Sequence, residues 1–169
     1  MSRLPLFTLE YSQWLPVPPR QAFVFFERPE NLSLVTPPAL GFDLLTPSPV
    51  RMYRGAVIDY TIRRLGIRLR WRTLISDYRP PYGFVDEQLT GPYSLWRHEH
   101  QFHPEGSGTR MTDSVVYALP NWLPDRLARL VERSYVRPQL DQIFLYREQR
   151  FAELLDTDRP LLFEVLQDA

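Results

Sequence analysis

The sequence predicts an α+β fold in which a curved antiparallel sheet of about seven strands wraps around one long C-terminal helix. Three observations predict it. Segments in which apolar and polar residues alternate fill most of the chain before residue 120, and their connections are too short for crossover helices. Two short helical segments follow the first strand. After residue 120, the spacing of apolar residues changes from two to the helical period.

The first strand and the short helices lie in the N-terminal third. FTLEYSQWL, residues 7–15, alternates as a strand, and the prolines of 16–19 end it and suit the first turn of a helix. Residues 20–26 then carry apolar side chains at helical spacing. Residues 30–35 predict a second helical turn, and residues 42–46 predict a short strand that is ended by further prolines.

Residues 57–78 predict a long β-hairpin that turns at Leu65-Gly66. Its apolar face carries Ile58, Tyr60, Ile62, Ile67, Leu69, Trp71, Thr73 and Ile75. Its other face carries a row of three arginines, Arg68, Arg70 and Arg72. We interpret this arginine row as a solvated face with charge pairs to Asp59 and Arg63, because antiparallel sheets commonly keep one face wet. A binding stripe for phosphate or a protein partner is the alternative.

Histidines fall on the inner face of the three strands predicted between residues 84 and 119. Trp96, His98, His100 and Phe102 alternate with polar residues. Side chains two apart share one face of a strand, so both histidines lie on the apolar side. A sheet that turns polar groups inward usually lines a cavity or a site rather than a dry core.

The last predicted hairpin has two plausible registers. One matches apolar residues, with Phe102 opposite Met111, whereas the other is shifted by one residue and sets Phe102 against Arg110. We choose the first, because a one-residue shift moves a whole apolar set to the wrong face. This register places Asp113 directly across from His100.

The preceding hairpin turns at residues 90–93, and the same reasoning pairs Trp96 with Glu87. Glu87 then joins the inner face beside His98, His100 and Asp113. If the turn is one residue longer or shorter, Asp86 and Gln88 replace Glu87 inside.

A long helix is predicted from about residue 123 to residue 155, with Asn121 or Asp125 as its N-cap. At ~1.5 Å per residue it spans about 45–50 Å, enough to cross a whole sheet. Pro138 lies within the pattern and is expected to kink the helix or to divide it in two. Residues 156–169 form a tail with its own apolar residues.

Composition favours one domain over residues 1–155. The chain has 169 residues, of which 44% are hydrophobic, and a formal net charge of zero, which gives no electrostatic case for binding nucleic acid or an anionic membrane. It has no cysteine, which excludes disulfides and thiol chemistry. The N-terminus lacks the pattern of a signal peptide, and no apolar run approaches membrane-spanning length. We therefore expect a cytoplasmic protein without stable membrane insertion.

The order of elements and several segments resemble the START-like, or SRPBCC, superfamily with its Bet v 1-like helix-grip fold, and in particular small bacterial cyclase/dehydrase-like proteins. The segments that carry the resemblance are PPRQAFVFFERPENLSLVTPP, GAVIDY, WRTLISDYRPPYGFVDEQLTGPYSLWRHEHQF and GTRMTDSVVYALP, within about residues 5–155. The resemblance implies a cavity for a hydrophobic or amphipathic small molecule. It carries over no catalytic residue set.

Four interpretations of the inner cluster of Glu87, His98, His100 and Asp113 stay open. Two histidines at i and i+2 with a facing carboxylate can hold a metal ion at about 2.0–2.2 Å. Asp113 can orient His100 as an acid/base group near neutral pH. The cluster can also hydrogen-bond the polar head of a ligand, or its members can satisfy one another. We favour ligand binding and assign no metal and no cofactor.

We therefore predict a protein that binds a lipid, isoprenoid, polyketide or aromatic molecule between the sheet and the C-terminal helix. Transport of that molecule is a further role that such binding allows. The predicted ligand-binding residues are Tyr60, Trp71, Glu87, Trp96, His98, His100, Met111, Asp113 and Tyr117. The first alternative is a polyketide cyclase/dehydratase-like or hydrolase-like enzyme, with His100 and Asp113 as the catalytic pair. The second is a protein-interaction module that uses the arginine row and residues 161–166 of the tail. The expected oligomeric state is a monomer or a homodimer.

Overall fold

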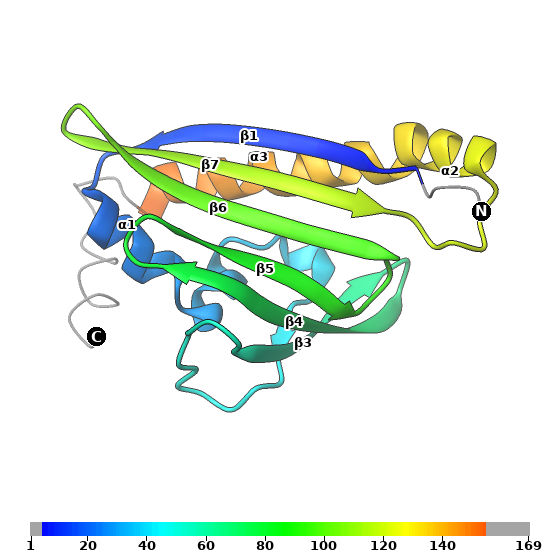
Figure 1. Cartoon of the computed structure of the whole chain (residues 1–169), viewed down its shortest axis with the longest axis horizontal. Coiled ribbons are helices and arrows are strands. Elements are labelled where there is room, and N and C mark those ends of the chain that lie inside the picture. The colour runs from blue at the N-terminus through cyan, green and yellow to red at the C-terminus, as the bar shows by residue number, and fades with distance from the viewer. Residues whose placement is uncertain (1–4, 155–169) are drawn as a thin grey trace.

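A computed structural model describes residues 5–154, in which a seven-stranded antiparallel sheet curves around a C-terminal helix (Figure 1). The strands are β1 Phe7–Leu15, β2 Asp43–Leu44, β3 Val57–Arg64, β4 Ile67–Arg79, β5 Gly83–Thr90, β6 Leu95–Glu105 and β7 Gly108–Ala118. The helical elements are α1 Pro19–Phe26, the 3₁₀ turns η1 Pro29–Leu34 and η2 Pro38–Leu40, α2 Asp125–Val131, the π-helical turn η3 Glu132–Val136 and α3 Arg137–Leu154. This is the predicted fold class.

The sheet order is β1-β7-β6-β5-β4-β3-β2, so the first strand of the chain pairs with the last. Each of the other neighbouring pairs is formed by consecutive strands, joined by tight connections except for residues 45–56 between β2 and β3. The helices α1, η1 and η2 occupy the longest connection within the described residues, between β1 and β2. In Figure 1, α3 crosses behind the sheet along β7 and β1, which leaves β3, β4 and β5 to curve away from it.

The β6–β7 register confirms the apolar matching made from the sequence. Phe102 pairs with Met111, and His100 pairs with Asp113. Both members of the apolar pair are fully buried. The two histidines and Asp113 therefore lie on the same face of the sheet.

The predicted β5–β6 register is wrong by one residue. His98 pairs with Asp86, and Glu87 pairs instead with Arg97 on the outer face, where their charged atoms lie 3.7 Å apart. The physical reason lies in the connection between the two strands. The side-chain amide of Gln88 donates a hydrogen bond to the carbonyl of Tyr93 and accepts one from its N–H, which closes a longer loop than residues 90–93. Asp86 thus replaces Glu87 inside.

The β3–β4 hairpin turns at Leu65 and Gly66, as predicted. Both residues have a positive φ, 51° and 77°, which the type I′ turn requires and which fits the twist of the strands. Within this hairpin, Asp59 forms ion pairs with Arg70 and Arg72, at 3.3 Å and 2.9 Å.

The arginine row is a charge-paired outer face. Besides the two pairs to Asp59, Arg68 lies 2.9 Å from Asp43 of β2. Arg63 adds no such pairing to the row, because it lies opposite Arg68 in the ladder and carries the same charge. The row is thus satisfied largely by acidic residues of the same sheet. The tail residues 161–166, on which the interaction hypothesis also depended, lie outside the described residues.

The C-terminal helix is interrupted where Pro138 was expected to interrupt it. α2 passes without a gap into the π-helical turn η3, where the Arg137 N–H bonds the carbonyl of Glu132, and Pro138, which has no N–H, follows as the second residue of α3. The predicted side-chain cap is wrong, because Pro124 occupies the N-cap position and Asp125 is the first helical residue. The carboxylate of Asp125 still lies in the first turn, where a negative charge favours a helix.

Two apolar clusters within the described residues flank the inner polar groups. The first cluster contains Phe23, Phe84, Phe102, Met111 and Phe151, and the second contains Trp71, Val115, Tyr117, Val136 and Phe144. His100 stacks on Phe84 of the first, with ring centroids 4.3 Å apart, and His98 contacts Phe144 of the second at 5.7 Å. No helix in the range 5–154 has the length and apolarity needed to cross a membrane.

Candidate functional site

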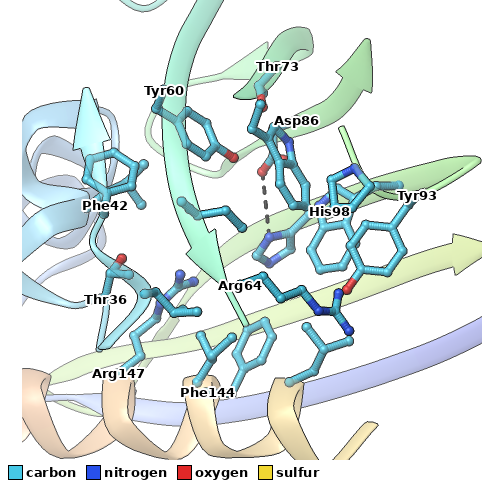
Figure 2. Close-up of a pocket in the computed structure, with 18 of the residues that line it drawn as sticks. Thr36, Phe42, Tyr60, Arg64, Thr73, Asp86, Tyr93, His98, Phe144 and Arg147 are labelled. Carbon is cyan, nitrogen blue, oxygen red and sulfur yellow. Dashed lines mark ion pairs between the residues drawn. The ribbon is translucent and has the colours of Figure 1, made fainter. Parts of the chain in front are cut away.

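A cavity of about 380 Å³ lies between the inner face of strands β3–β6, the segment 36–42 and α3. Figure 2 shows Asp86 and His98 directed into it from the sheet, with Phe144 and Arg147 rising from α3 on the opposite side. The wall is mostly aromatic and aliphatic. Tyr60 and Trp71 are stacked with centroids 6.0 Å apart, and Trp96 meets Trp71 edge-on at 5.4 Å.

Five of the predicted site residues line this cavity: Tyr60, Trp71, Trp96, His98 and His100. Met111 and Tyr117 do not, because each is 0% exposed inside an apolar cluster. Asp113 lies behind the histidines and borders a second, smaller pocket instead. Glu87 is on the outer face of the sheet, as its pairing with Arg97 shows.

Sequence reasoning missed several residues of the cavity. The sequence placed Asp86 on the inner face only in the alternative in which the turn at residues 90–93 is one residue longer or shorter. Arg147 and Phe144 carry a signal that was available, since 140, 144 and 147 share one helical face. Tyr135 belongs to the same apolar pattern at helical spacing, whereas Tyr93 carried no such signal, because a loop places it at the cavity.

Asp86, His98, His100 and Asp113 form a compact buried group, the His/Asp cluster. His98 Nε2 lies 2.8 Å from Asp113 Oδ1, and His98 Nδ1 lies 3.6 Å from Asp86 Oδ2. His100 Nδ1 lies 2.8 Å from Asp113 Oδ1, and His100 Nε2 lies 3.0 Å from Asp86 Oδ2. The two rings are 3.8 Å apart. Each imidazole thus has one nitrogen at each carboxylate.

The environment moves the pKa values of the two histidines in opposite directions. Burial lowers the pKa of His98, and the charge of His100 lowers it further. Burial also acts to lower the pKa of His100, but the carboxylates of Asp113 and Asp86 outweigh it and raise that pKa. The unlike pair, one imidazole favouring the neutral form and one the charged form, is an arrangement that acid/base sites use.

The carboxylates stay ionised despite their burial. Burial acts to raise the pKa of Asp86, but the hydrogen bond and the charges from the histidines outweigh it and lower the pKa. Burial is likewise outweighed at Asp113, where the ring nitrogens of His100 and His98, each 2.8 Å from Oδ1, hold the pKa far below its usual range. The cluster therefore carries two negative charges that need compensation within the site.

The model of the family described as polyketide cyclase/dehydrase and lipid transport matches residues 15–144. The chain belongs to this family. The match includes the strands and the part of α3 that enclose the cavity, up to Phe144. No curated protein matches the chain.

Solved structures of proteins with low sequence identity share the fold of this member of the family. The protein Ms6760 from Mycobacterium smegmatis is 15% identical, with a TM-score of 0.66 over 90% of this chain and 92% of that one. The Zhui aromatase/cyclase from a Streptomyces species is 12% identical, with a TM-score of 0.65 over 89% and 96%. Ara h 8.0201 is 16% identical, with a TM-score of 0.59 over 88% and 99%. These likenesses show the shared helix-grip fold.

Several polar groups in the wall of the cavity have no hydrogen-bond partner among the described residues. Besides His100 Nδ1, they are Trp71 Nε1, Thr73 Oγ1, Tyr135 Oη and Arg147 Nε, four groups outside the His/Asp cluster. A buried polar atom without a hydrogen-bond partner costs about 1–3 kcal/mol of stability, and such atoms in folded proteins normally have a partner. All four groups can donate a hydrogen bond, so a molecule with hydrogen-bond acceptors can pair with them in the cavity.

Proposed function

We propose that the protein binds an amphipathic small molecule in the cavity between the sheet and α3, with the apolar body of the molecule against the aromatic wall. The observation that carries this proposal is the combination of an apolar cavity of about 380 Å³ with buried, unpartnered donors in its wall. Cavities of ~300–1,000 Å³ with a few convergent polar groups are typical of small-molecule sites. The family description, which names lipid transport, is consistent with such a ligand.

The polar end of the ligand lies toward Arg147, Thr73 and the His/Asp cluster. Arg147 lines the cavity with one guanidinium N–H free of protein partners, and the Thr73 hydroxyl lies on the same wall as Trp71. A ligand with oxygen acceptors, such as a carboxylate or a ketone, satisfies these donors. A pure hydrocarbon leaves them unpaired, so we expect it to bind more weakly.

Native mass spectrometry of the protein as purified, followed by extraction under denaturing conditions, tests the proposal. A retained lipid, polyketide or aromatic mass supports it. Thr73→Val then removes one donor at constant volume, and we expect about fivefold weaker binding of the extracted molecule, which corresponds to ~1 kcal/mol. Thr61→Val is the matched control, because Thr61 is buried in the same hairpin but does not line the cavity.

The proposal fails if no small molecule is retained and if hydrophobic fluorescent probes do not bind at a site where they quench tryptophan emission. Trp71 and Trp96 line the cavity, whereas Trp122 is exposed, so Trp122→Phe lowers the background without touching the site. Equal effects of Thr73→Val and Thr61→Val would also contradict binding in this cavity.

An enzymatic role is the second candidate, and the opposite pKa shifts of His98 and His100 favour it. Such a reaction is a cyclisation or dehydration of a bound polyketide-like molecule, with His100 as the acid/base group and Asp113 as its orienting partner. His100→Gln should then abolish turnover while the substrate still binds. Unchanged turnover in that variant excludes His100 from catalysis.

A further inference from the structure

We propose that Asp86, His98 and His100 form a binding site for one divalent transition-metal ion, with Asp113 as the outer partner of both histidines. The site opens into the cavity but does not depend on the proposed ligand. The three residues offer ligand atoms that all lie within 4.8 Å of one another, although they come from two strands.

The strand registers produce this convergence. Pairing of β5 with β6 sets Asp86 opposite His98, and pairing of β6 with β7 sets Asp113 opposite His100. The two histidines are two residues apart on β6 and thus share its inner face. Rigid strands on both sides hold the donor atoms, which is how a metal site keeps its geometry.

The distances fit a metal ion with two nitrogen ligands and one oxygen ligand. Asp86 Oδ2 lies 3.0 Å from His100 Nε2 and 3.6 Å from His98 Nδ1. A tetrahedral ion with bonds of ~2.0–2.2 Å separates neighbouring ligand atoms by about 3.3–3.6 Å. The two distances to Asp86 lie within a few tenths of an ångström of this range, and all three ligand atoms lie within 4.8 Å of one another.

Asp113 lies where an outer partner of metal-bound histidines belongs. Its Oδ1 is 2.8 Å from His98 Nε2 and 2.8 Å from His100 Nδ1, the two nitrogens that face away from Asp86. Histidine ligands usually donate their second N–H to a carboxylate, which fixes the tautomer and orients the ring. With both N–H groups directed at Asp113, the lone pairs of His98 Nδ1 and His100 Nε2 converge beside Asp86.

The count of protons also favours a cation. Three contacts between nitrogen and carboxylate oxygen are 3.0 Å or shorter, but two neutral imidazoles provide only two N–H groups. A third proton would create a buried imidazolium whose ring centroid lies 3.8 Å from that of the other histidine. One dication beside Asp86 takes the place of that proton and neutralises the two carboxylates.

His100 Nδ1 gives a second sign that protons alone leave the cluster incomplete. It is buried, and although Asp113 Oδ1 is 2.8 Å away, the angle is too bent for a hydrogen bond. Rotation of the His100 ring that moves Nε2 toward a metal ion also changes the angle of the contact between Nδ1 and Asp113 Oδ1. The buried nitrogen then gains its hydrogen bond to Asp113.

The chemistry of the donor set indicates the class of ion and its role. Two imidazoles and a carboxylate suit Zn²⁺, Co²⁺, Ni²⁺ or Fe²⁺ rather than Mg²⁺ or Ca²⁺. All three ligands line the cavity, so a further coordination position is open to water or to a bound molecule. Arg147 lines the same cavity and interacts electrostatically with Asp86, which favours an anionic oxygen at that position.

Metal titration of protein prepared without a histidine tag and stripped with a chelator tests the inference. We expect one equivalent of Zn²⁺ by elemental analysis after gel filtration, and Co²⁺ should give the intense visible absorption of a low-symmetry, four-coordinate site. Asp86→Asn and His100→Gln should each abolish stoichiometric uptake. His103→Gln is the matched control, because His103 is on the same strand but exposed, and it should bind like the wild type.

Asp113→Asn keeps the shape of the outer partner and removes its charge, so we expect ~10–100-fold weaker Zn²⁺ binding. The inference is overturned if the stripped wild-type protein takes up no stoichiometric metal, or if Asp86→Asn and His100→Gln retain it. Circular dichroism verifies that each variant is folded, and His98→Gln replaces Asp86→Asn if that variant is not. Binding of a hydrophobic probe to the metal-free protein distinguishes failure of the metal site from failure of the cavity.

Discussion

Asp113 is the residue on which the buried polar group most depends. It contacts ring nitrogens of both histidines and borders the smaller pocket behind them. A single carboxylate thereby lies 2.8 Å from one nitrogen of each buried imidazole, on the side away from Asp86. Removing one partner of a buried ionic group leaves the others uncompensated.

We expect Asp113→Ala to destabilise the metal-free protein by about 3–5 kcal/mol, because it removes a carboxylate that contacts two buried histidines. Urea denaturation followed by tryptophan fluorescence measures the change. Glu105→Ala is the control, since Glu105 pairs with Arg110 at the exposed end of the same hairpin and its loss should change little. A loss below ~1 kcal/mol for Asp113→Ala would show that the histidines find other partners.

Asp59 provides a pH-dependent contribution on the outer face of the sheet. Its hydrogen bond to Arg72 lowers the pKa of the carboxyl, and the charges of Arg72 and Arg70 act in the same direction. A carboxyl with a lowered pKa in the folded state stabilises that state above its unfolded pKa of about 3.9. This contribution disappears as the pH falls through the folded pKa.

We therefore expect Asp59→Asn to be less stable than the wild type at pH 7, with a difference that shrinks below about pH 4. Denaturant midpoints of both proteins at a series of pH values measure it. High salt should reduce the difference at pH 7, because the arginines are exposed. A difference that is independent of pH would attribute the effect of the substitution to packing.

The π-helical turn η3 is the element that joins the long helix to the sheet. Tyr117 of β7 donates a hydrogen bond to Glu132 Oε1 at 2.9 Å, and Arg137 pairs with the same oxygen at 2.9 Å. Arg137 also donates to the carbonyl of Thr8 in β1. The wider turn places Glu132 over β7, so the interruption before Pro138 anchors the helix to the strands beneath it.

Tyr117→Phe removes the hydroxyl that anchors Glu132 without changing the packing of the ring. A hydrogen bond to a charged group contributes about 1.5–3 kcal/mol, and we expect a destabilisation of that size. The control Tyr53→Phe alters a tyrosine that is 54% exposed and should change stability by less than ~0.5 kcal/mol. Equal stabilities of the two variants would mean that Arg137 alone satisfies Glu132.

Across the whole molecule, the cavity couples ligand binding to stability. The sheet, the segment 36–42 and α3 enclose one space, so a ligand there contacts elements that separate on unfolding. Binding to the folded state alone stabilises it by about 2.7 kcal/mol at 100 times the Kd. For a protein of this size, each kcal/mol raises the Tm by roughly 2–4 °C.

Thermal melting in the presence of the extracted ligand should therefore show a rise of about 5–10 °C at 100 times its Kd. The rise should fall as ligand concentration falls and disappear for molecules that bind only the protein surface weakly. An unchanged Tm with saturating ligand would mean that the ligand binds the unfolded chain equally well.

The fold class, the β6–β7 register and the helix interruption just before Pro138 follow from sequence patterns alone, because each has one strongly preferred solution. Apolar matching left only one energetically acceptable pairing for Phe102, and a proline inside a helical pattern cannot complete the hydrogen-bond ladder. The inward placement of His98 and His100 followed from the same strand periodicity.

The carboxylate and the helix residues that join the histidines depend on tertiary contacts that no sequence pattern specifies. Phe84 and Val85 are both apolar and both buried, so β5 has no alternation that could reject a one-residue shift, and the Gln88 contacts in the loop settled it for Asp86. Arg147 meets the sheet only because η3 and α3 fold across it. Periodicity specifies the face on which a side chain lies, whereas loop closure and helix docking specify what it meets there.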